Sequence, residues 1–177
     1  MADRLRSRAG KLAGVCVSAL LLAAAALFID SPAEKDGELD CAVRSVHDGD
    51  SMRVQCPGRK GTIAVRMRQI DAPELEQAHG IRARDQLRAL CRNGSRAIIR
   101  SAGHDQYGRL LGDVYCQGRS VNAEMVGSGA AWVYERYAED HTLRELQRQA
   151  RAQRRGLWAG RNPLPPWQWR YDQRAGG

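Results

Sequence analysis

Apolar and polar side chains alternate along residues 41–68, and a repeat of two residues is typical of β-strands that bury one face. Asp48-Gly49 lies within this stretch, and an Asp-Gly pair between alternating residues is a strong signal for a tight hairpin. Pro73 disfavours extension of the last stretch, which passes into a loop at 70–74. The pattern predicts strands over 41–46, 52–56 and 63–68, with Arg66 and Arg68 on the face opposite Ile63, Val65 and Met67.

The rest of the chain shows mostly helical spacing, with apolar residues three and four positions apart. We expect a helix over 79–92, strands over 97–100 and 110–116 around a turn at 103–108, and a helix over 121–127. An irregular or extended segment follows at 132–137. A last helix is capped by Asp140 and ended by Gly156, and a Pro/Trp-rich tail over 163–169 packs back on the domain. This order predicts an α+β fold that is mainly β: a five-stranded OB-fold barrel with about three helices.

Residues 1–33 have the pattern of a secretory signal peptide: basic residues, an apolar stretch over 12–29, and small residues up to Ala33. A stretch of 18 apolar residues is also just long enough to span a bilayer, so an uncleaved membrane anchor through 12–29 is the alternative. Both place the domain outside the cytoplasm, secreted or periplasmic in a bacterium, or anchored to the inner membrane and facing outward. The expected boundaries are a leader over 1–33, a linker over 34–38, the domain over 39–170 and a tail over 171–177.

Four cysteines follow the leader, and an even number in an exported domain indicates two disulfides. Three pairings are possible. Cys41 and Cys56 lie almost equidistant from the Asp48-Gly49 turn, which favours a cross-strand Cys41–Cys56 bond and leaves Cys91–Cys116 as the second. A zinc site is not indicated, because the sequence has no C-x-x-C and no paired histidines.

The chain is basic, with a formal net charge of +8, and 25 of its 28 basic residues are arginine. The planar guanidinium of arginine suits phosphate, so a polyanion is the first partner to consider. The alternative is a basic surface that only contacts solvent.

Carboxylates and arginines are the residues best suited to chemistry here. Asp50 and Asp71 offer the hard oxygen ligands that Ca²⁺ prefers. Glu74 could accept a proton from water, and Arg66 and Arg109 could stabilise a phosphate that gains charge. Each residue also has an ordinary structural interpretation, as a turn former or a solvated strand residue, and spacing alone does not bring the five together.

Four motifs in this order make the chain resemble the thermonuclease family, the staphylococcal-nuclease-like enzymes. The resemblance covers about residues 41–170. The motifs are Asp48-Gly49-Asp50-Ser51, Arg66 to Glu74 (RMRQIDAPE), Asp105 to Leu110 (DQYGRL) and Val121 to Val126 (VNAEMV), and the end of the chain, Gly156-Leu157-Trp158 with Pro165-Pro166-Trp167, looks like many bacterial members.

The resemblance implies an OB-fold endonuclease that needs one Ca²⁺ ion, cuts DNA and RNA with little sequence preference and leaves 3′-phosphate ends. No protein partner is implied, and a monomer is expected because nothing in the sequence suggests a long heptad repeat or a swapped strand. By motif matching, Asp50, Asp71 and the backbone carbonyl of Ala72 would be calcium ligands, Glu74 the catalytic carboxylate, and Arg66 and Arg109 the arginines that bind and stabilise the phosphate. Tyr137 and Tyr107 would contact substrate.

The sequence departs from the family pattern at a few positions. Ala72 stands where threonine is common, which a backbone ligand tolerates, and Ser51 replaces a frequent threonine. Glu135 occupies the place of one stacking tyrosine and Gln106 that of a frequent lysine, so both bear on substrate binding. The alternative function is a noncatalytic OB-fold module that binds nucleic acid, in a form that could be membrane-anchored and act in DNA uptake.

Overall fold

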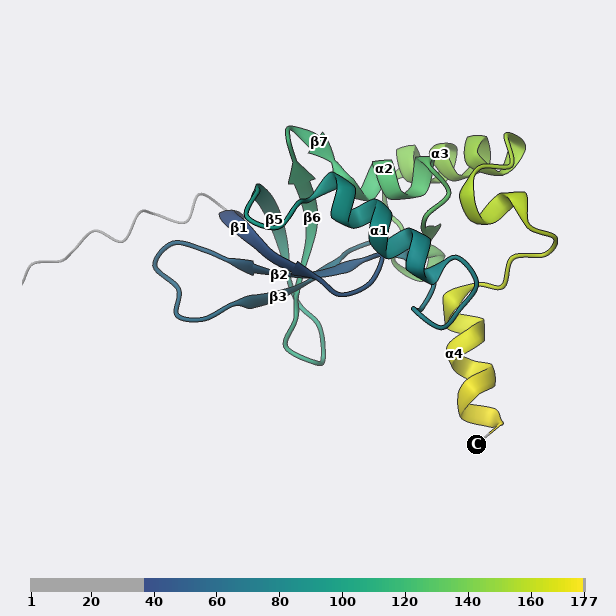
Figure 1. Ribbon diagram of the computed structural model, residues 1–177, viewed down its shortest axis with the longest axis horizontal. Coiled ribbons are helices and arrows are strands. Elements are labelled where there is room, and N and C mark those ends of the chain that lie inside the picture. The colour runs from purple at the N-terminus through teal and green to yellow at the C-terminus, as the bar shows by residue number, and fades with distance from the viewer. Residues whose placement is uncertain (1–36, 177) are drawn as a thin grey trace, which may run out of the picture. The chain divides into compact units, whose positions relative to one another are not determined.

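A closed barrel of five strands forms the body of residues 37–176, which are the residues described by the computed structural model (Figure 1). The leader, the anchor alternative and most of the linker lie outside these residues. The barrel strands follow the order β3-β2-β1-β5-β6, and a parallel pairing of β3 with β6 closes it. Their bounds are β1 (Glu38–Val46), β2 (Ser51–Gln55), β3 (Ile63–Met67), β5 (Arg96–His104) and β6 (Leu110–Cys116).

The two-residue alternation of the sequence becomes the inside and outside of this barrel. Val54, Val65 and Val114 are fully buried, and each lies on a different strand. Arg66 lies between the buried residues Val65 and Met67 of β3, and Arg68 follows the end of the strand; neither arginine is in the buried core, so both face outward. The predicted face of β3 is therefore confirmed, and with it the outward position of Arg66.

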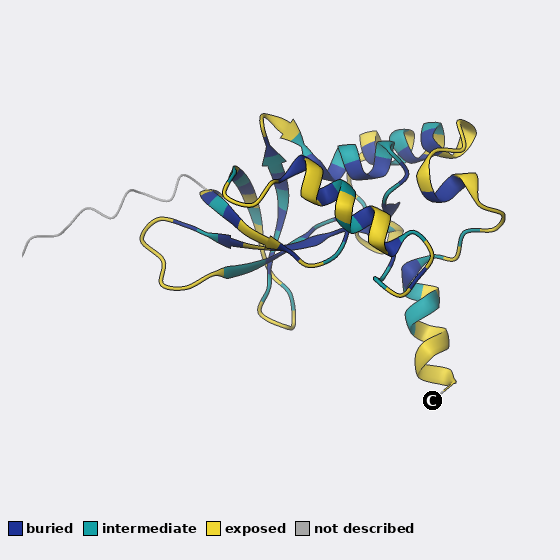
Figure 2. Cartoon of the chain, in the orientation of Figure 1, coloured by how far each residue is buried: buried dark blue, intermediate teal, exposed yellow. Residues whose placement is uncertain are grey.

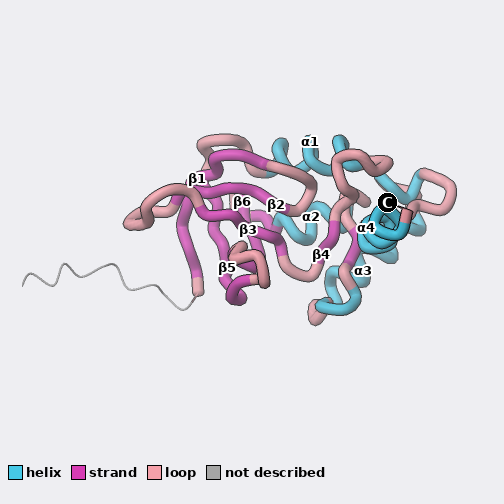
Figure 3. Tube along the Cα trace, turned by 90° about the horizontal axis from the view of Figure 1, so that it is seen from below, coloured by secondary structure: helices cyan, strands magenta, loops and turns pink. Residues whose placement is uncertain are grey.

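Four α-helices lie beside one end of the barrel (Figure 3). Side-chain caps begin two of them, since Ser120 accepts a hydrogen bond from the N–H of Ala123 and Asp140 from that of Thr142. The helices are α1 (Gly80–Leu90), α2 (Val121–Gly127), α3 (His141–Ala152) and α4 (Pro166–Ala175), with 3-10 turns at Glu135–Tyr137 and Gly156–Ala159.

The predicted α+β barrel of the OB type is confirmed, and the differences are local. The loop expected at 70–74 begins with a two-residue strand, β4 (Ile70–Asp71), which pairs with β8 (Trp132–Val133). A further short strand, β7 (Arg119–Ser120), follows β6. The β5 strand continues to His104 rather than ending near residue 100. Its pairing with β6 is irregular between Ser101 and His104 but resumes at His104, which pairs with Leu110. The expected tail contains the fourth helix, α4, and α3 ends at Ala152, before Gly156.

Two disulfides join the barrel, with the predicted pairing. Cys41–Cys56 links β1 to the residue after β2, and Cys91–Cys116 links the end of α1 to β6. All four cysteines are buried. The two bonds are consistent with an extracellular or periplasmic protein. Within residues 37–176 no helix is long and apolar enough to cross a membrane.

A second, smaller apolar cluster lies outside the barrel and holds α4. Trp132 and Trp158 meet edge to face, with ring centroids 4.3 Å apart. Trp167 of α4 packs against Trp132 at 5.7 Å and stacks on Tyr134 at 5.4 Å. The start of α4 is thus anchored by aromatic contacts, whereas its last turns are exposed (Figure 2).

Substitution of Gly80 tests how tightly α1 packs on the segment before it. A Cβ atom at Gly80 would overlap the carbonyl group of Glu74, so Gly80→Ala should lower the free energy of unfolding by about 1–3 kcal/mol in urea titrations. Gly127→Ala is the control, because its Cβ would meet only Leu146, at 3.5 Å. Equal stability of the two variants would contradict the packing described.

Candidate active site

The turn between β1 and β2 presents Asp50. The carboxylate of Asp48 accepts hydrogen bonds from the N–H groups of Asp50 (3.0 Å) and Ser51 (2.7 Å), which fixes the turn. The carbonyl of Asp50 accepts from the N–H of Met67 at 2.9 Å, so the turn is tied to β3. Asp50 is 5% exposed, and its side-chain oxygen accepts from the N–H of Ala72 at 2.6 Å.

Arg66 holds the reversal that follows β3. Its Nη1 donates to the carbonyls of Met67 (2.7 Å) and Ile70 (2.9 Å). Gln69 adopts a φ of 64° between them, a left-handed conformation that turns the chain sharply. One guanidinium therefore bridges both sides of a strained turn, which places Asp71 beside the barrel.

The same guanidinium joins two buried carboxylates. Its Nη2 lies 2.9 Å from Asp71 and 3.2 Å from Asp50. Asp71 is 1% exposed. Burial raises the pKa of Asp50 to about 8; Arg66 opposes this shift, while the charges of Asp48 and Asp71 add to it. Asp50 therefore holds its proton more readily than an exposed aspartate does.

Glu74 follows Asp71 in the loop before α1 and is held by its backbone. Its carbonyl accepts from the N–H of Gln77 at 2.9 Å, and its N–H donates to the Gln77 side chain at 3.3 Å. The side chain of Glu74 is 31% exposed, whereas that of Asp71 is buried. Water can therefore reach Glu74 at the edge of a buried pair of carboxylates.

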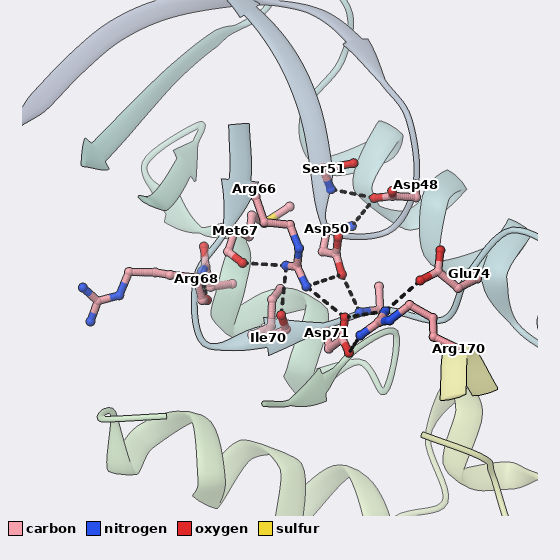
Figure 4. A network of polar contacts seen from close by, with 12 residues as sticks. Asp48, Asp50, Ser51, Arg66, Met67, Arg68, Ile70, Asp71, Glu74 and Arg170 are labelled. Carbon is pink, nitrogen blue, oxygen red and sulfur yellow. Dashed lines mark hydrogen bonds and ion pairs between the residues drawn. The ribbon is translucent and has the colours of Figure 1, made fainter. Parts of the chain in front are cut away.

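Arg170 of α4 enters this site from the end of the chain (Figure 4). Its Nη2 donates to Asp71 at 2.7 Å, and its Nη1 donates to Glu74 at 2.7 Å and to the other oxygen of Asp71 at 3.3 Å. Burial alone would lower the pKa of Arg170, but its hydrogen bonds to Asp71 and Glu74 outweigh burial and raise it. The sequence analysis missed this residue.

Arg109 lies apart from these carboxylates. Its Nε forms an ion pair with Asp105 at 2.8 Å, and no contact joins it to Asp50, Asp71 or Glu74 within the described part of the chain. Burial pushes the pKa of Asp105 upward, but the backbone N–H and guanidinium of Arg109 outweigh burial and leave that pKa below its usual value. The β3–β6 register pairs Val65 with Leu110, both buried, so Arg109 and Arg66 belong to the outward-facing positions of neighbouring strands.

The two tyrosines expected to contact substrate are exposed. Tyr107 stands at the tip of the turn after β5, with the Arg109 guanidinium 5.7 Å from its ring centre. Tyr137 is 57% exposed and lies 5.1 Å from Tyr134, edge to face. Glu135 forms an ion pair with Arg144 at 2.9 Å. The stacked pair of Tyr134 and Trp167 is a further aromatic surface near α4 that the sequence analysis did not single out.

Five of the predicted site residues thus converge: the carboxylates Asp50 and Asp71 around Arg66, Ala72 through its N–H, and Glu74 through Arg170. Arg109, Tyr107 and Tyr137 lie outside this contact network in residues 37–176. No local sequence pattern predicts the position of Arg170, which is 96 residues from Glu74 and 99 from Asp71 in the sequence.

Comparison with known proteins decides the family. The family model for "Staphylococcal nuclease homologue" matches residues 64–160. An Escherichia coli protein named "Uncharacterized endonuclease" is 42% identical over 146 residues, which cover 82% of this chain and 94% of that protein. The chain belongs to the staphylococcal nuclease family. A Haemophilus influenzae protein with the same name is 39% identical, over 76% of this chain and 74% of that protein. The rice protein "Probable staphylococcal-like nuclease CAN2" is 42% identical over 62% of this chain and 30% of its own length.

The staphylococcal nuclease match covers most of the site but not all of it. Arg66, Asp71, Glu74 and Arg109 fall within residues 64–160, whereas Arg170 lies beyond the matched segment. Asp50 likewise lies outside residues 64–160, so the matched segment holds only part of the site.

The donors present fit a hard cation. Asp50, Asp71 and Glu74 offer only carboxylate oxygen, the ligand type that Ca²⁺ prefers. As the side chains stand in residues 37–176, no three acidic, histidine or cysteine groups are placed to hold an ion together. Arg170 lies between two of these carboxylates, and its guanidinium bonds both.

Removal of the Arg66 guanidinium should destabilise the fold of this staphylococcal nuclease homologue. The side chain is 14% exposed, and Arg66→Ala removes a charged donor from two buried carboxylates and a donor from two backbone carbonyls. Urea unfolding in EGTA should show a loss of about 3–5 kcal/mol.

The control is Arg96→Ala, which removes an equally well-formed pair with Asp40 on the surface, where the Arg96 side chain is 72% exposed. Its effect should be much smaller, because solvent screens exposed ion pairs. Similar losses in both variants would show that Arg66 does not support the turn as described.

Proposed function

We propose that the protein is an exported, calcium-dependent, sugar-nonspecific endonuclease that hydrolyses phosphodiester bonds of DNA and RNA and leaves 3′-phosphate ends. The observation that carries the proposal is the cluster of Asp50 and Asp71 around Arg66, with Glu74 joined to Asp71 through Arg170, in a staphylococcal nuclease homologue. Relatives named endonuclease and staphylococcal-like nuclease support hydrolysis of nucleic acid, and the family is generally calcium-dependent.

Asp50, Asp71 and the carbonyl of Ala72 would hold one Ca²⁺ ion. When bound, the ion would supply Lewis-acid stabilisation to a phosphate oxygen and favour ionisation of water. The protein prepares for this charge by fixing Asp50 through the N–H of Ala72 and by burying Asp71 almost completely. Both carboxylates are therefore oriented before any ligand arrives, which reduces the reorganisation that binding requires.

Glu74 is the proposed general base. Its backbone is fixed by Gln77, while its carboxylate reaches solvent at the edge of the site. It can accept a proton from a water that attacks phosphorus in line with the 5′ oxygen, which leaves with the rest of the strand. The phosphate then stays on the 3′ oxygen of the other fragment, and the leaving 5′ oxygen takes a proton from solvent to become a hydroxyl.

Arg66 and Arg109, the two arginines of the family motifs, would have different roles. Arg66 contacts both carboxylates and two carbonyls, so its main contribution is to position the site and offset its negative charge. Arg109 bonds Asp105 through Nε, and its side chain is 35% exposed, which leaves its outer nitrogens accessible to a phosphate. Charge-assisted hydrogen bonds from Arg109 would stabilise the transition state.

Export rests on the leader pattern over 1–33 and on the two disulfides, which form in oxidising compartments. The second candidate function is a noncatalytic module that binds nucleic acid. The hydrogen bonds of Arg170 to Asp71 and Glu74 favour it, because they occupy the carboxylates that hydrolysis needs. Plasmid DNA that stays intact with the protein and Ca²⁺ would support this candidate.

Glu74→Gln tests the proposed base. The amide keeps the shape of the side chain but accepts protons poorly, so the rate of plasmid cleavage in Ca²⁺ should fall by about 10²–10⁴-fold. Glu76→Gln, a change of the same type at an exposed neighbour, should cleave at the wild-type rate. Wild-type turnover by Glu74→Gln would remove Glu74 from the mechanism.

Arg109→Ala tests transition-state stabilisation. Loss of a charged donor aimed at the phosphate should reduce kcat by about 10²–10³-fold, measured with a fluorescent oligonucleotide at saturating Ca²⁺. Arg44→Ala, which removes an exposed arginine of β1, controls for the general loss of positive charge. If both variants lose only substrate affinity with kcat unchanged, Arg109 acts through nonspecific attraction alone.

A further inference from the structure

The guanidinium of Arg170 bonds Asp71, one of the proposed calcium ligands, and Glu74, the proposed base. It bonds both oxygens of Asp71, at 2.7 and 3.3 Å, and one oxygen of Glu74, at 2.7 Å. We propose that α4 is an autoinhibitory element in which Arg170 occupies the cation position, so that Ca²⁺ binds the site only by displacing this guanidinium. The inference rests on the calcium site of the proposed function and adds a competitor for it.

The fold of α4 explains why this arginine reaches the carboxylates. Pro166 is buried at the first turn of the helix, where proline is well tolerated. Trp167 stacks on Tyr134, and the carbonyl of Leu164 accepts a hydrogen bond from Gln77 at 2.6 Å. Arg170 follows Trp167 by three positions, so both lie on one face of the helix. The face that docks through Trp167 therefore also aims Arg170 at Asp71.

Geometry makes the two cations mutually exclusive at Asp71. Its oxygens already accept three hydrogen bonds, one from Arg66 and two from Arg170. A calcium ion binds carboxylate oxygen at about 2.3–2.6 Å and needs the same lone pairs. If both were bound, two positive charges would lie within a few ångströms of each other beside a buried carboxylate, where repulsion is weakly screened. The guanidinium must therefore leave before the ion can bind Asp71, and its departure also frees the carboxylate of Glu74.

The position of Arg170 allows this release. Its side chain is 33% exposed, and the helix beyond it is exposed (Figure 2). The aromatic contacts that anchor α4 involve Trp167, not Arg170, so the guanidinium can swing into solvent while the start of the helix stays docked. In Figure 4, Arg170 approaches the carboxylates from the helix side, opposite Arg66. Arg66 is bonded to two carbonyls besides the carboxylates and remains in place.

Thermodynamic linkage gives the testable consequence. If Ca²⁺ binding weakens the Arg170 contact, removal of that contact must tighten Ca²⁺ binding by the same factor. Calcium affinity of the full chain, measured by isothermal titration calorimetry at physiological ionic strength, reports this directly and does not depend on turnover. The dissociation constant of Arg170→Ala should be lower than that of the wild type by about 5- to 150-fold.

Arg174→Ala is the matched control. Arg174 is exposed on the same helix one turn later, and the substitution removes the same charge without touching the carboxylates. Its calcium dissociation constant should stay within about twofold of the wild type, because salt screens exposed charges beyond about 8 Å. Equal tightening in both variants would show a general charge effect and overturn the proposed displacement.

Unfolding in urea supplies a second readout. In EGTA, Arg170→Ala should be less stable than the wild type, since Asp71 and Glu74 lose a donor. Ca²⁺ at one fixed, saturating concentration should stabilise Arg170→Ala more than the wild type, because an ion that binds only the folded state stabilises it by an amount that grows with the logarithm of its affinity. A destabilisation that Ca²⁺ leaves unchanged would mean that Arg170 has a structural role only.

Asp71→Asn separates the failure of this inference from that of the proposed function. If the wild type and Arg170→Ala bind Ca²⁺ with equal affinity and Asp71→Asn abolishes binding, the calcium site stands and the displacement is wrong. If neither the wild type nor Arg170→Ala binds Ca²⁺, the calcium dependence in the proposed function fails, and the autoinhibitory role fails with it.

Discussion

The site depends on one guanidinium, that of Arg66. It bonds the carbonyls on both sides of the left-handed residue Gln69, and it bonds Asp50 and Asp71 at once. Without this donor the turn after β3 would expose unsatisfied carbonyls, and two buried carboxylates would repel each other. The two carboxylates are buried beside one fixed cation, and this arrangement favours the binding of a second cation, either the guanidinium of Arg170 or a metal ion.

Two separate apolar clusters position the parts of the chain that form the site. The barrel core orients β3 and the turn before β2, and so fixes Arg66 and Asp50. The cluster of Trp132 and Trp158 outside the barrel receives Trp167 and thereby positions α4. Because β8 contains Trp132 and pairs with β4, which contains Asp71, the aromatic cluster is linked through a two-residue sheet to the carboxylates. Docking of α4 and the geometry of Asp71 are therefore mechanically connected.

The sequence predicted those features that arise from local patterns. Alternation identified the barrel strands because burial repeats every two residues, and Asp140 marked the start of α3 because a cap acts within one turn. The β4–β8 pair was not expected, since two residues per strand carry no readable alternation. Within the site, Asp50, Asp71 and Glu74 were found by their chemistry and family motifs. Arg170 was not, because a contact across 99 residues leaves no trace in local spacing. Pro166 is a helix-start signal, and Trp167 and Arg170 three positions apart share one helix face, but two such residues in a Pro/Trp-rich tail do not by themselves predict a contact with Asp71.

The central claim is that these carboxylates and arginines form a calcium-dependent hydrolytic site. Its most direct test is digestion of supercoiled plasmid by the purified full chain in Ca²⁺ and in EGTA, followed by mapping of the product ends. The account predicts cleavage only with Ca²⁺ and 3′ ends that a polymerase extends only after phosphatase treatment. Plasmid that remains supercoiled with Ca²⁺ and the folded protein, or ends that extend without phosphatase, would contradict it.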